Sequence, residues 1–307
     1  MGLLGWASPS RPSRGTLSVQ RRLPEWFTVR MPGGASFLDL RRQLRTAELH
    51  TVCEEARCPN IGDCWERKSA TFMILGDVCT RACRYCAVTS GRPSAIDPGE
   101  PARLARTVEH LGLRYCVITS VDRDDLPDGG ASVFAECIEL IKERLAECKV
   151  EVLIPDFAGD REALHTVLDA GPTVLNHNIE TVRRVFKSVR AKGDYDLSLD
   201  LLARSREHAA GIPTKSGMMV GLGETTDEVL ATMADLREAG VELLTVGQYL
   251  RPSSAHVAMD RFYHPSEFAE LARAGRAMGF RHVAAGPLVR SSYHAEEQLE
   301  AAAAASA

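Results

Sequence analysis

Apolar residues fall into short, nearly continuous runs from residue 71 onward. Seven runs rich in Val, Ile, Leu and Met cover residues 71–77, 115–120, 150–156, 173–179, 216–222, 243–250 and 282–288. Runs of this length, without polar alternation, are typical of parallel strands that are buried on both faces. We expect each run to form a strand, of which the seventh is a short candidate.

The segments between these runs carry helix signals. Asp160 is placed to cap a helix that ends before Gly171. Thr225 and Glu228 form a capping-box pattern at the start of a helix that runs to Gly240. Further helices are expected over residues 131–147 and from Pro265 to near Gly279. The alternation of strand and helix implies right-handed crossovers and a parallel sheet or barrel.

The predicted fold class is α/β, a partial (β/α)6 TIM-like barrel with N-terminal and C-terminal extensions. Six or so strand–helix repeats are too few to close the usual eight-unit barrel, so the barrel should be open. We divide the chain into a disordered basic arm (1–24), an N-terminal extension (25–70), the barrel (71–280) and a C-terminal segment with a frayed tail (281–307). Chemistry in such folds lies at the carboxyl ends of the strands.

Composition and charge disfavour several other classes of protein. The chain has 307 residues, with 45% hydrophobic residues, 25% charged residues and a formal net charge of −4. This balance does not favour nucleic acid or an anionic membrane as a partner. Apolar runs stay well below the roughly 20 residues of a membrane helix, and the N-terminus lacks a secretory apolar core. Residues 1–24 carry Arg, Ser and Pro without an acid, which favours the arm over an organelle transit segment.

Cysteines are unusually clustered. Six of the nine lie between Cys53 and Cys86, a pattern that favours metal or catalytic roles over disulfides. One trio, spaced C-x3-C-x2-C directly after the first predicted strand, consists of Cys79, Cys83 and Cys86. Three thiolates suit a 4Fe–4S cube whose fourth iron is left for a small ligand. A partial zinc site with its fourth ligand elsewhere is the alternative.

A second trio lies upstream with the spacing C-x4-C-x5-C. Its members are Cys53, Cys58 and Cys64. Pro59, Asn60 and Gly62 between them predict a loop rather than a helix. A loop of this composition can wrap a cluster, while zinc binding or an accidental group of thiols remains open for this trio taken alone.

Three cysteines lie outside both trios. We expect Cys116, in an apolar run, and Cys137, on the apolar face of a predicted helix, to be buried core thiols. Cys148 has no assigned role.

The two trios in this order resemble those of the lipoyl synthase family, a branch of the radical S-adenosylmethionine enzymes. The C-x3-C-x2-C spacing with Tyr85 before the last cysteine resembles the superfamily, and the upstream trio with a terminal RSSY resembles the family. The likeness runs from PEWFTVR (24–30) to RSSYHAEE (290–297) and includes LNHNIETV and KSGMMVGLGET. Ala87 stands where members commonly have a larger or acidic residue, which concerns loop packing.

The resemblance implies a sulfurtransferase that inserts sulfur at carbons 6 and 8 of a protein-bound octanoyl-lysine to form the lipoyl group. It implies that the downstream trio holds a 4Fe–4S cluster that binds S-adenosylmethionine and generates a 5′-deoxyadenosyl radical. The upstream trio would hold an auxiliary 4Fe–4S cluster that serves as the sulfur donor. Ser292 would complete that cluster as a labile fourth ligand, with Arg290 nearby to help it leave.

Candidates for contacts with S-adenosylmethionine or substrate follow from the family and from strand-end positions. They are Tyr85, Ser120, Asp122, Asn178, Glu180, Arg190, Lys215, Ser216 and Glu224. Tyr85 is expected near the adenine or in loop packing, and Arg190 near the cofactor carboxylate on family grounds alone. Solvated loop groups and helix caps are the alternatives for the strand-end residues, and His177 is expected to be a core or loop histidine.

The resemblance also implies partners. These are octanoylated lipoyl domains of 2-oxoacid dehydrogenases, the glycine cleavage H protein, and an electron donor such as ferredoxin or flavodoxin. A bacterial cytoplasm is expected, with the mitochondrial matrix as the alternative. An enzyme that adds methylthio groups to RNA would need a nucleic-acid-binding module, and a zinc-stabilised scaffold would contain zinc and no iron.

Overall fold

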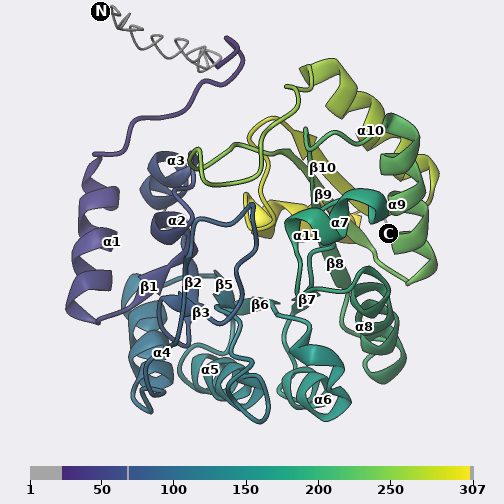
Figure 1. Ribbon diagram of the computed structural model, residues 1–307. Coiled ribbons are helices and arrows are strands. Elements are labelled where there is room, and N and C mark those ends of the chain that lie inside the picture. The colour runs from purple at the N-terminus through teal and green to yellow at the C-terminus, as the bar shows by residue number, and fades with distance from the viewer. Residues whose placement is uncertain (1–22, 68, 305–307) are drawn as a thin grey trace, which may run out of the picture.

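An open eight-stranded sheet organises the protein (Figure 1). The computed structural model describes residues 23–67 and 69–304. The strand order is β1-β2-β5-β6-β7-β8-β9-β10, and every pair from β2 to β10 is parallel. Because β1 and β10 are the two ends of this order, the barrel is partial, as predicted.

All seven predicted strands are present, each close to its expected place. The strands are β2 (Thr71–Ile74), β5 (Tyr115–Ser120), β6 (Lys149–Leu153), β7 (Val174–Asn176), β8 (Thr214–Val220), β9 (Leu243–Gln248) and β10 (His282–Gly286). The first ends earlier than the apolar run because Leu75 and Gly76 have positive φ values of 69° and 88°. That backbone cannot continue a strand.

Six helices form the outer layer around the sheet (Figure 1). They are α4 (Glu100–Leu111), α5 (Ala131–Arg144), α6 (Arg161–Asp169), α8 (Tyr195–His208), α9 (Thr226–Glu238) and α10 (Pro265–Ala277). A short α7 (Arg183–Val189) and a 3-10 turn (Phe157–Gly159) lie in loops. The predicted caps are confirmed: Asp160 accepts hydrogen bonds from the first turn of α6, and Thr225 forms a capping box with Glu228.

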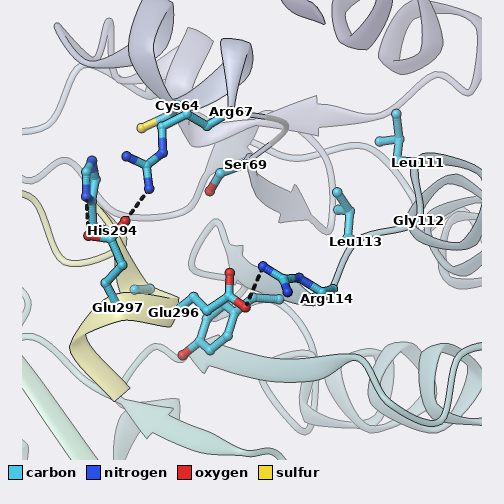
Figure 2. Close-up of a pocket in the computed structure, with 12 residues that line it drawn as sticks. Cys64, Arg67, Ser69, Leu111, Gly112, Leu113, Arg114, His294, Glu296 and Glu297 are labelled. Carbon is cyan, nitrogen blue, oxygen red and sulfur yellow. Dashed lines mark hydrogen bonds and ion pairs between the residues drawn. The ribbon is translucent and has the colours of Figure 1, made fainter. Parts of the chain in front are cut away.

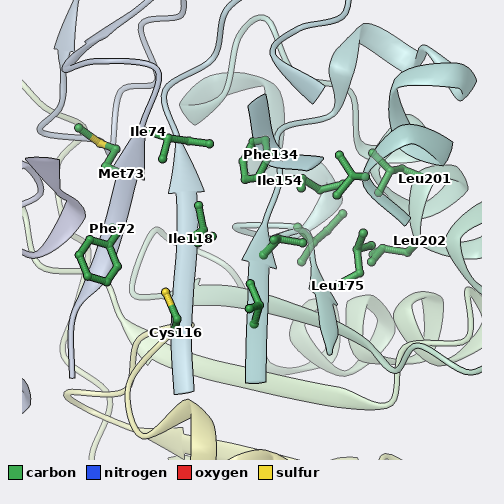
Figure 3. Close-up of a cluster of buried hydrophobic side chains, with 14 of the residues drawn as sticks. Phe72, Met73, Ile74, Cys116, Ile118, Phe134, Ile154, Leu175, Leu201 and Leu202 are labelled. Carbon is green, nitrogen blue, oxygen red and sulfur yellow. The ribbon is translucent and has the colours of Figure 1, made fainter. Parts of the chain in front are cut away.

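The core lies between the sheet and this helical layer (Figure 3). Ile118 and Leu175 of the sheet are fully buried, as are Phe134 of α5 and Leu202 of α8. Side chains of this size each contribute roughly 1.5–3 kcal/mol by burial. The remaining cysteines, Cys116, Cys137 and Cys148, are also buried, so the prediction of core thiols holds for the first two. No helix in the described part of the chain has the length and apolar content to cross a membrane.

The N-terminal extension corrects one prediction. It contains α1 (Ala35–Thr46), β1 (His50–Thr51), α2 (Val52–Glu55) and α3 (Ile61–Glu66). The upstream cysteine segment was predicted to be a loop, yet two of its cysteines lie in short helices. Thr51 caps α2 by accepting from the Glu54 N–H, and Trp65 of α3 is fully buried against Phe37 at 4.9 Å between ring centroids. Tertiary packing therefore overrides the loop signal.

The C-terminal tail corrects a second prediction from the sequence. Residues 301–304 were predicted to be frayed, but they complete α11 (Ala295–Ala304). Alanine has the highest helix propensity, and Ala302 is 1% exposed. The predicted arm falls almost entirely in residues 1–22, which lie outside the described residues with 305–307.

Candidate functional site

One cavity of about 520 Å³ collects most of the predicted site residues. Those that line it are Cys53, Cys58, Cys79, Cys83, Cys86, Tyr85, Ser120, Asp122, Asn178, Glu180, Arg190, Arg290 and Ser292. The volume is in the range of small-molecule sites. The cavity extends from the carboxyl ends of the strands into the interior of the barrel, because its wall also includes Thr71 at the start of β2.

The downstream cysteine loop is closed at its base by a pair of short parallel strands. β3 (Val78–Cys79) pairs with β4 (Thr89–Ser90), and the Gly91 N–H donates to the Cys79 carbonyl at 2.9 Å. Backbone N–H groups of Arg81 and Asp122 donate to Cys79 Sγ at 3.4 and 3.3 Å. The three thiols are thus presented to the cavity from one compact loop.

Arg81 anchors this loop, and sequence reasoning did not single it out. Its guanidinium makes two 2.7 Å hydrogen bonds to Asp156, beyond β6, and further bonds to Asp124, beyond β5. The Arg81 side chain is 4% exposed and that of Asp156 is 2% exposed. Burial alone would raise the pKa of Asp156, but the hydrogen bonds from Arg81 outweigh it and lower the pKa to about 2. The partners are far apart in sequence, so spacing carried no signal.

The upstream trio reaches the cavity from its other side. Cys53 lies in α2 and Cys58 in the following turn, and both line the cavity. Cys64 of α3 instead faces an adjoining pocket of about 230 Å³. Figure 2 shows Cys64 beside Arg67, whose guanidinium pairs with Glu297 of α11. Cys64 therefore lines a different pocket from the other two thiols, but both lie close enough to add to the effect of burial in raising its pKa.

The C-terminal segment brings Ser292 to the upstream trio. Asn60 Nδ2 donates to the Leu288 carbonyl at 2.7 Å, and the Tyr293 hydroxyl donates to Asp63 Oδ2 at 3.4 Å. The cysteine segment therefore holds the chain on both sides of Ser292. Arg290 lies beside Cys58: burial lowers the pKa of the guanidinium, and the thiol opposes that effect.

A glycine in β9 makes room for this segment, and it too was missed. A Cβ atom on Gly247 would lie 2.1 Å from the Val289 carbonyl oxygen and 3.2 Å from Arg290 Nη1. Real Cβ contacts are essentially never under 3.0 Å. The close approach of two backbones is the usual reason for a glycine inside a strand, and here it admits the segment that carries Ser292.

The candidates for cofactor contact at the far side of the cavity lie together. Glu180 has a positive φ of 67°, and burial raises the pKa of its carboxyl group while Arg190, Asn178 and Tyr85 favour its charged form. Arg190 Nη1 also donates to the Asn178 carbonyl at 3.3 Å. A strained backbone at a half-buried carboxylate in a cavity wall is typical of a ligand-binding position.

Three buried polar atoms in the cavity wall have no hydrogen-bond partner among the described residues. They are Ser120 Oγ, His177 Nε2 and Asp122 Oδ1, of which the last lies 3.4 Å from Arg81 Nε in an ion pair. The His177 ring is held by Nδ1, 2.9 Å from the Ile154 carbonyl oxygen. Because a carbonyl only accepts, Nδ1 carries the hydrogen and Nε2 presents a lone pair. Such unsatisfied groups are expected where a ligand supplies the missing bond.

Three candidates lie elsewhere, which corrects the expectation that they face the ligand. Ser216 is fully buried, and its Oγ accepts a hydrogen bond from the Ile179 N–H at 3.2 Å. Lys215 Nζ is fully buried and pairs with Glu151 at 3.0 Å, near the amino-terminal end of β8. Glu224 accepts hydrogen bonds from the N–H groups of Gly221 and Leu222 at 2.6 and 2.8 Å, so it stabilises the turn after β8. None of these three residues lines the cavity.

The donor set fits iron–sulfur centres. Burial raises the pKa of Cys53 to about 11, of Cys83 to about 12 and of Cys86 to about 11. Such thiols stay protonated unless a bound cation favours the thiolate, so metal binding and deprotonation are coupled. Across the described residues, no three His, Cys, Asp or Glu side chains are gathered for a single metal ion. The downstream loop offers three thiols to the cavity, and the chain extensions offer two thiols and a hydroxyl with Cys64 close by, so this donor set fits two clusters.

Comparisons with known sequences identify the relatives of this chain. The profile of the radical SAM superfamily matches residues 73–236, and that of the N-terminal domain of lipoyl synthase of the radical SAM family matches residues 10–58. The chain is 54% identical to the lipoyl synthase of Rubrobacter xylanophilus over 292 residues, which cover 95% of this chain and 90% of that protein. It is 55% identical to the lipoyl synthase of Roseiflexus sp. over 284 residues, which cover 92% and 94%.

Solved structures with a similar fold include methylornithine synthase and HydG, a maturase of the [FeFe]-hydrogenase. The first aligns with a TM-score of 0.54 at 13% identity, over 68% of this chain and 62% of that chain. The second aligns with a TM-score of 0.54 at 20% identity, over 68% and 49%. At these identities the likeness concerns the barrel fold.

Proposed function

Because this chain belongs to the lipoyl synthase family of radical S-adenosylmethionine enzymes, we propose that its cavity divides the family reaction between two cysteine trios. The enzyme is a sulfurtransferase: it inserts sulfur at carbons 6 and 8 of a protein-bound octanoyl-lysine, and it uses S-adenosylmethionine and two 4Fe–4S clusters. The proposal concerns which residues of this chain perform each part.

The observation that carries the assignment is the shared cavity. Cys79, Cys83 and Cys86 line it from one loop, while Cys53, Cys58 and Ser292 line it from the two chain extensions. We assign the first set, with its vacant fourth position, to the cluster that binds S-adenosylmethionine, and the second set with Cys64 to the auxiliary cluster. When bound, the first cluster supplies the electron that releases a 5′-deoxyadenosyl radical from S-adenosylmethionine, and the second supplies sulfur.

Polar groups on the far wall are suited to hold S-adenosylmethionine. Arg190 is a buried cation that can pair with its carboxylate, and Glu180 is a half-buried carboxylate that can accept from its ammonium or ribose hydroxyl groups. Ser120 Oγ and His177 Nε2 offer further unpaired hydrogen-bonding atoms. Tyr85 stabilises the Glu180 carboxylate, and its ring lies in the cavity wall.

Apolar residues in the cavity wall suit the octanoyl chain. They include Val121, Leu153, Ile154, Met218 and Val289. A lining of this kind favours burial of a hydrocarbon and excludes water, which protects a reactive radical from side reactions.

Ser292 and Arg290 are assigned to the step in which the auxiliary centre yields sulfur. A hydroxyl oxygen is a harder donor than a thiolate and a poorer match for an iron–sulfur centre, so Ser292 is the ligand that leaves most readily. Arg290 lies beside Cys58 and carries a permanent positive charge that can pair with the departing oxygen.

The partners follow from the substrate. The open edge of the barrel allows a lysine arm to enter, so we propose octanoylated lipoyl domains and the glycine cleavage H protein as carriers. A one-electron donor such as ferredoxin or flavodoxin would reduce the downstream cluster. The relatives named above are bacterial, which supports a cytoplasmic location over the mitochondrial matrix.

Anaerobic incubation of the reconstituted protein with an octanoyl-lysine peptide, reductant and S-adenosylmethionine tests the function. Mass spectrometry should show a product that has gained two sulfur atoms, and that has also lost two hydrogen atoms if the dithiol is oxidised to the cyclic disulfide before measurement. The Cys83→Ala variant is the control and should leave the peptide unchanged. An unchanged peptide with the wild-type chain, or zinc in place of iron, would contradict the proposal.

A further inference from the structure

Thr71 contacts two of the four proposed auxiliary ligands. It is the first residue of β2, it is 5% exposed, and it lines the cavity. Its hydroxyl donates to Ser292 Oγ at 2.7 Å, and its backbone lies close enough to the Cys53 thiol to lower the pKa of that thiol against the larger effect of burial. One residue therefore joins ligands that come from opposite ends of the chain.

The sheet fixes the direction of this hydroxyl. Thr71 pairs in parallel register with Val117 of β5, and the next residue, Phe72, pairs with Thr51 of β1. A β-branched side chain on a buried strand has little rotational freedom. The position of the oxygen is therefore set by the backbone before either ligand segment reaches it.

The other anchors of the C-terminal segment act on its flanks. Asn60 bonds the Leu288 carbonyl, and Asp63 accepts from the Tyr293 hydroxyl. Thr71, in contrast, donates its hydrogen bond directly to the Ser292 side chain, and in the described part of the chain no other hydrogen bond to that side chain is found. A ligand oxygen keeps a lone pair for this bond, because a hydroxyl oxygen has two acceptor sites.

We propose that Thr71 is a positioning residue that aims Ser292 Oγ and Cys53 Sγ at one centre and so determines how firmly the auxiliary site retains its serine-bound iron. The inference rests on the ligand roles proposed above. Loss of the hydroxyl would free the Ser292 rotamer and leave the segment in place, so the effect should be confined to one iron.

The test isolates the auxiliary site. In a chain whose Cys79, Cys83 and Cys86 are all changed to Ala, reconstitution should give about four irons, one cube. Release of the first iron to a chelator is then followed by absorbance, with the electron paramagnetic resonance spectrum reporting the three-iron product. Thr71→Val should accelerate that release about fivefold, the ratio expected for one hydrogen bond.

Two further variants separate the hydroxyl from the fold. Thr71→Ser keeps the donor and should release iron at the parental rate. Thr214→Val makes the same change at the start of β8, where the threonine hydroxyl bonds the Gly240 carbonyl at 3.1 Å outside the cavity, and it should also have no effect on release.

The outcomes are distinguishable. A parental chain that binds no iron would overturn the auxiliary-site assignment and the role of Thr71 with it. A parental chain that binds four irons, with release from Thr71→Val equal to or slower than from the parent, would overturn the role of Thr71 alone. Faster release from Thr71→Ser as well would also overturn it, because the hydroxyl would not be the cause.

Discussion

At the scale of residues, the two cysteine trios differ in one oxygen atom, the hydroxyl oxygen of Ser292. The downstream trio has three thiols and a vacant position, whereas the upstream trio has Ser292 beside it, hydrogen-bonded to Thr71. Taken from the sequence alone, Ser292 would be an ordinary surface hydroxyl, and only its family position suggested a ligand. The fold turns it into a half-buried group in the cavity wall.

Replacement of the serine by a better ligand should separate the two halves of the reaction. Ser292→Cys provides a thiolate that binds iron more firmly, so S-adenosylmethionine cleavage should continue while lipoyl formation falls below about a tenth of the wild-type yield. Both products are measured in the same anaerobic assay. Ser254→Cys, at an exposed position, controls for an added thiol. Normal lipoyl formation by Ser292→Cys would exclude the labile-ligand role.

Short elements and close backbone contacts position the ligands at the scale of secondary structure. The β3–β4 pair closes the downstream loop, and Arg81 ties that loop to the segments that follow β5 and β6. On the other side, Gly247 of β9 allows the C-terminal segment to lie against the sheet. The ligands are thus held by rigid strands through a few specific contacts.

Gly247→Ala should displace the segment that carries Ser292. The added Cβ would lie 2.1 Å from the Val289 carbonyl oxygen, so the segment must shift. We expect lipoyl formation to fall at least about tenfold, since a misplacement of 1 Å can cost that much or more. Gly211→Ala is the matched control, because nothing lies within 4 Å of its Cβ position. Wild-type yield from Gly247→Ala would contradict this packing argument.

Asp156→Asn should weaken the anchor of the downstream loop. Loss of one partner of a buried ion pair costs about 3 kcal/mol of unfolding free energy, measured by denaturant titration of the metal-free protein. Asp200→Asn breaks an ion pair in which the carboxylate is 54% exposed, and it should cost less than about 1 kcal/mol. Equal losses in the two variants would contradict the anchoring role.

The effect of Asp156→Asn should also depend on pH. The folded pKa of Asp156 is lowered to about 2, below the ordinary value of about 4 in the unfolded chain. Its stabilisation is therefore complete above pH 4 and is lost as the pH falls toward 2. The difference in unfolding free energy between wild type and variant should shrink over that interval, and a constant difference would exclude the charged pair as its source.

The open barrel brings the two chain extensions to one site at the scale of the whole molecule. α2 and the turn after it contribute Cys53 and Cys58, and the segment after β10 contributes Ser292. These segments are adjacent because Asn60 and Asp63 bond the C-terminal segment directly. A closed eight-unit barrel would leave less room for both extensions and for an entering lysine arm.

Iron content should report the two centres separately. Anaerobically reconstituted wild-type protein should contain about eight irons, and a chain with Cys79, Cys83 and Cys86 changed to Ala should contain about four. Cys137→Ala, a change in the core outside both trios, should leave the content at about eight. Four irons in the wild-type protein would mean that one trio does not hold a cluster.

The sequence by itself determined the barrel strands, the main helix caps, both cysteine trios and, through the family likeness, the candidate role of Ser292. These features depend on local composition and on spacing along the chain, and both can be read directly from the sequence. Sequence reasoning wrongly predicted a loop for the upstream segment and placed Lys215, Ser216 and Glu224 toward the ligand.

Only the tertiary structure decided those cases and revealed Arg81, Gly247 and Thr71. The Arg81–Asp156 pair, the approach of Val289 to Gly247 and the hydrogen bond from Thr71 to Ser292 each join residues distant in sequence. Spacing along the chain carries no trace of such contacts, because they form only when the sheet brings separate strands and both extensions to one cavity.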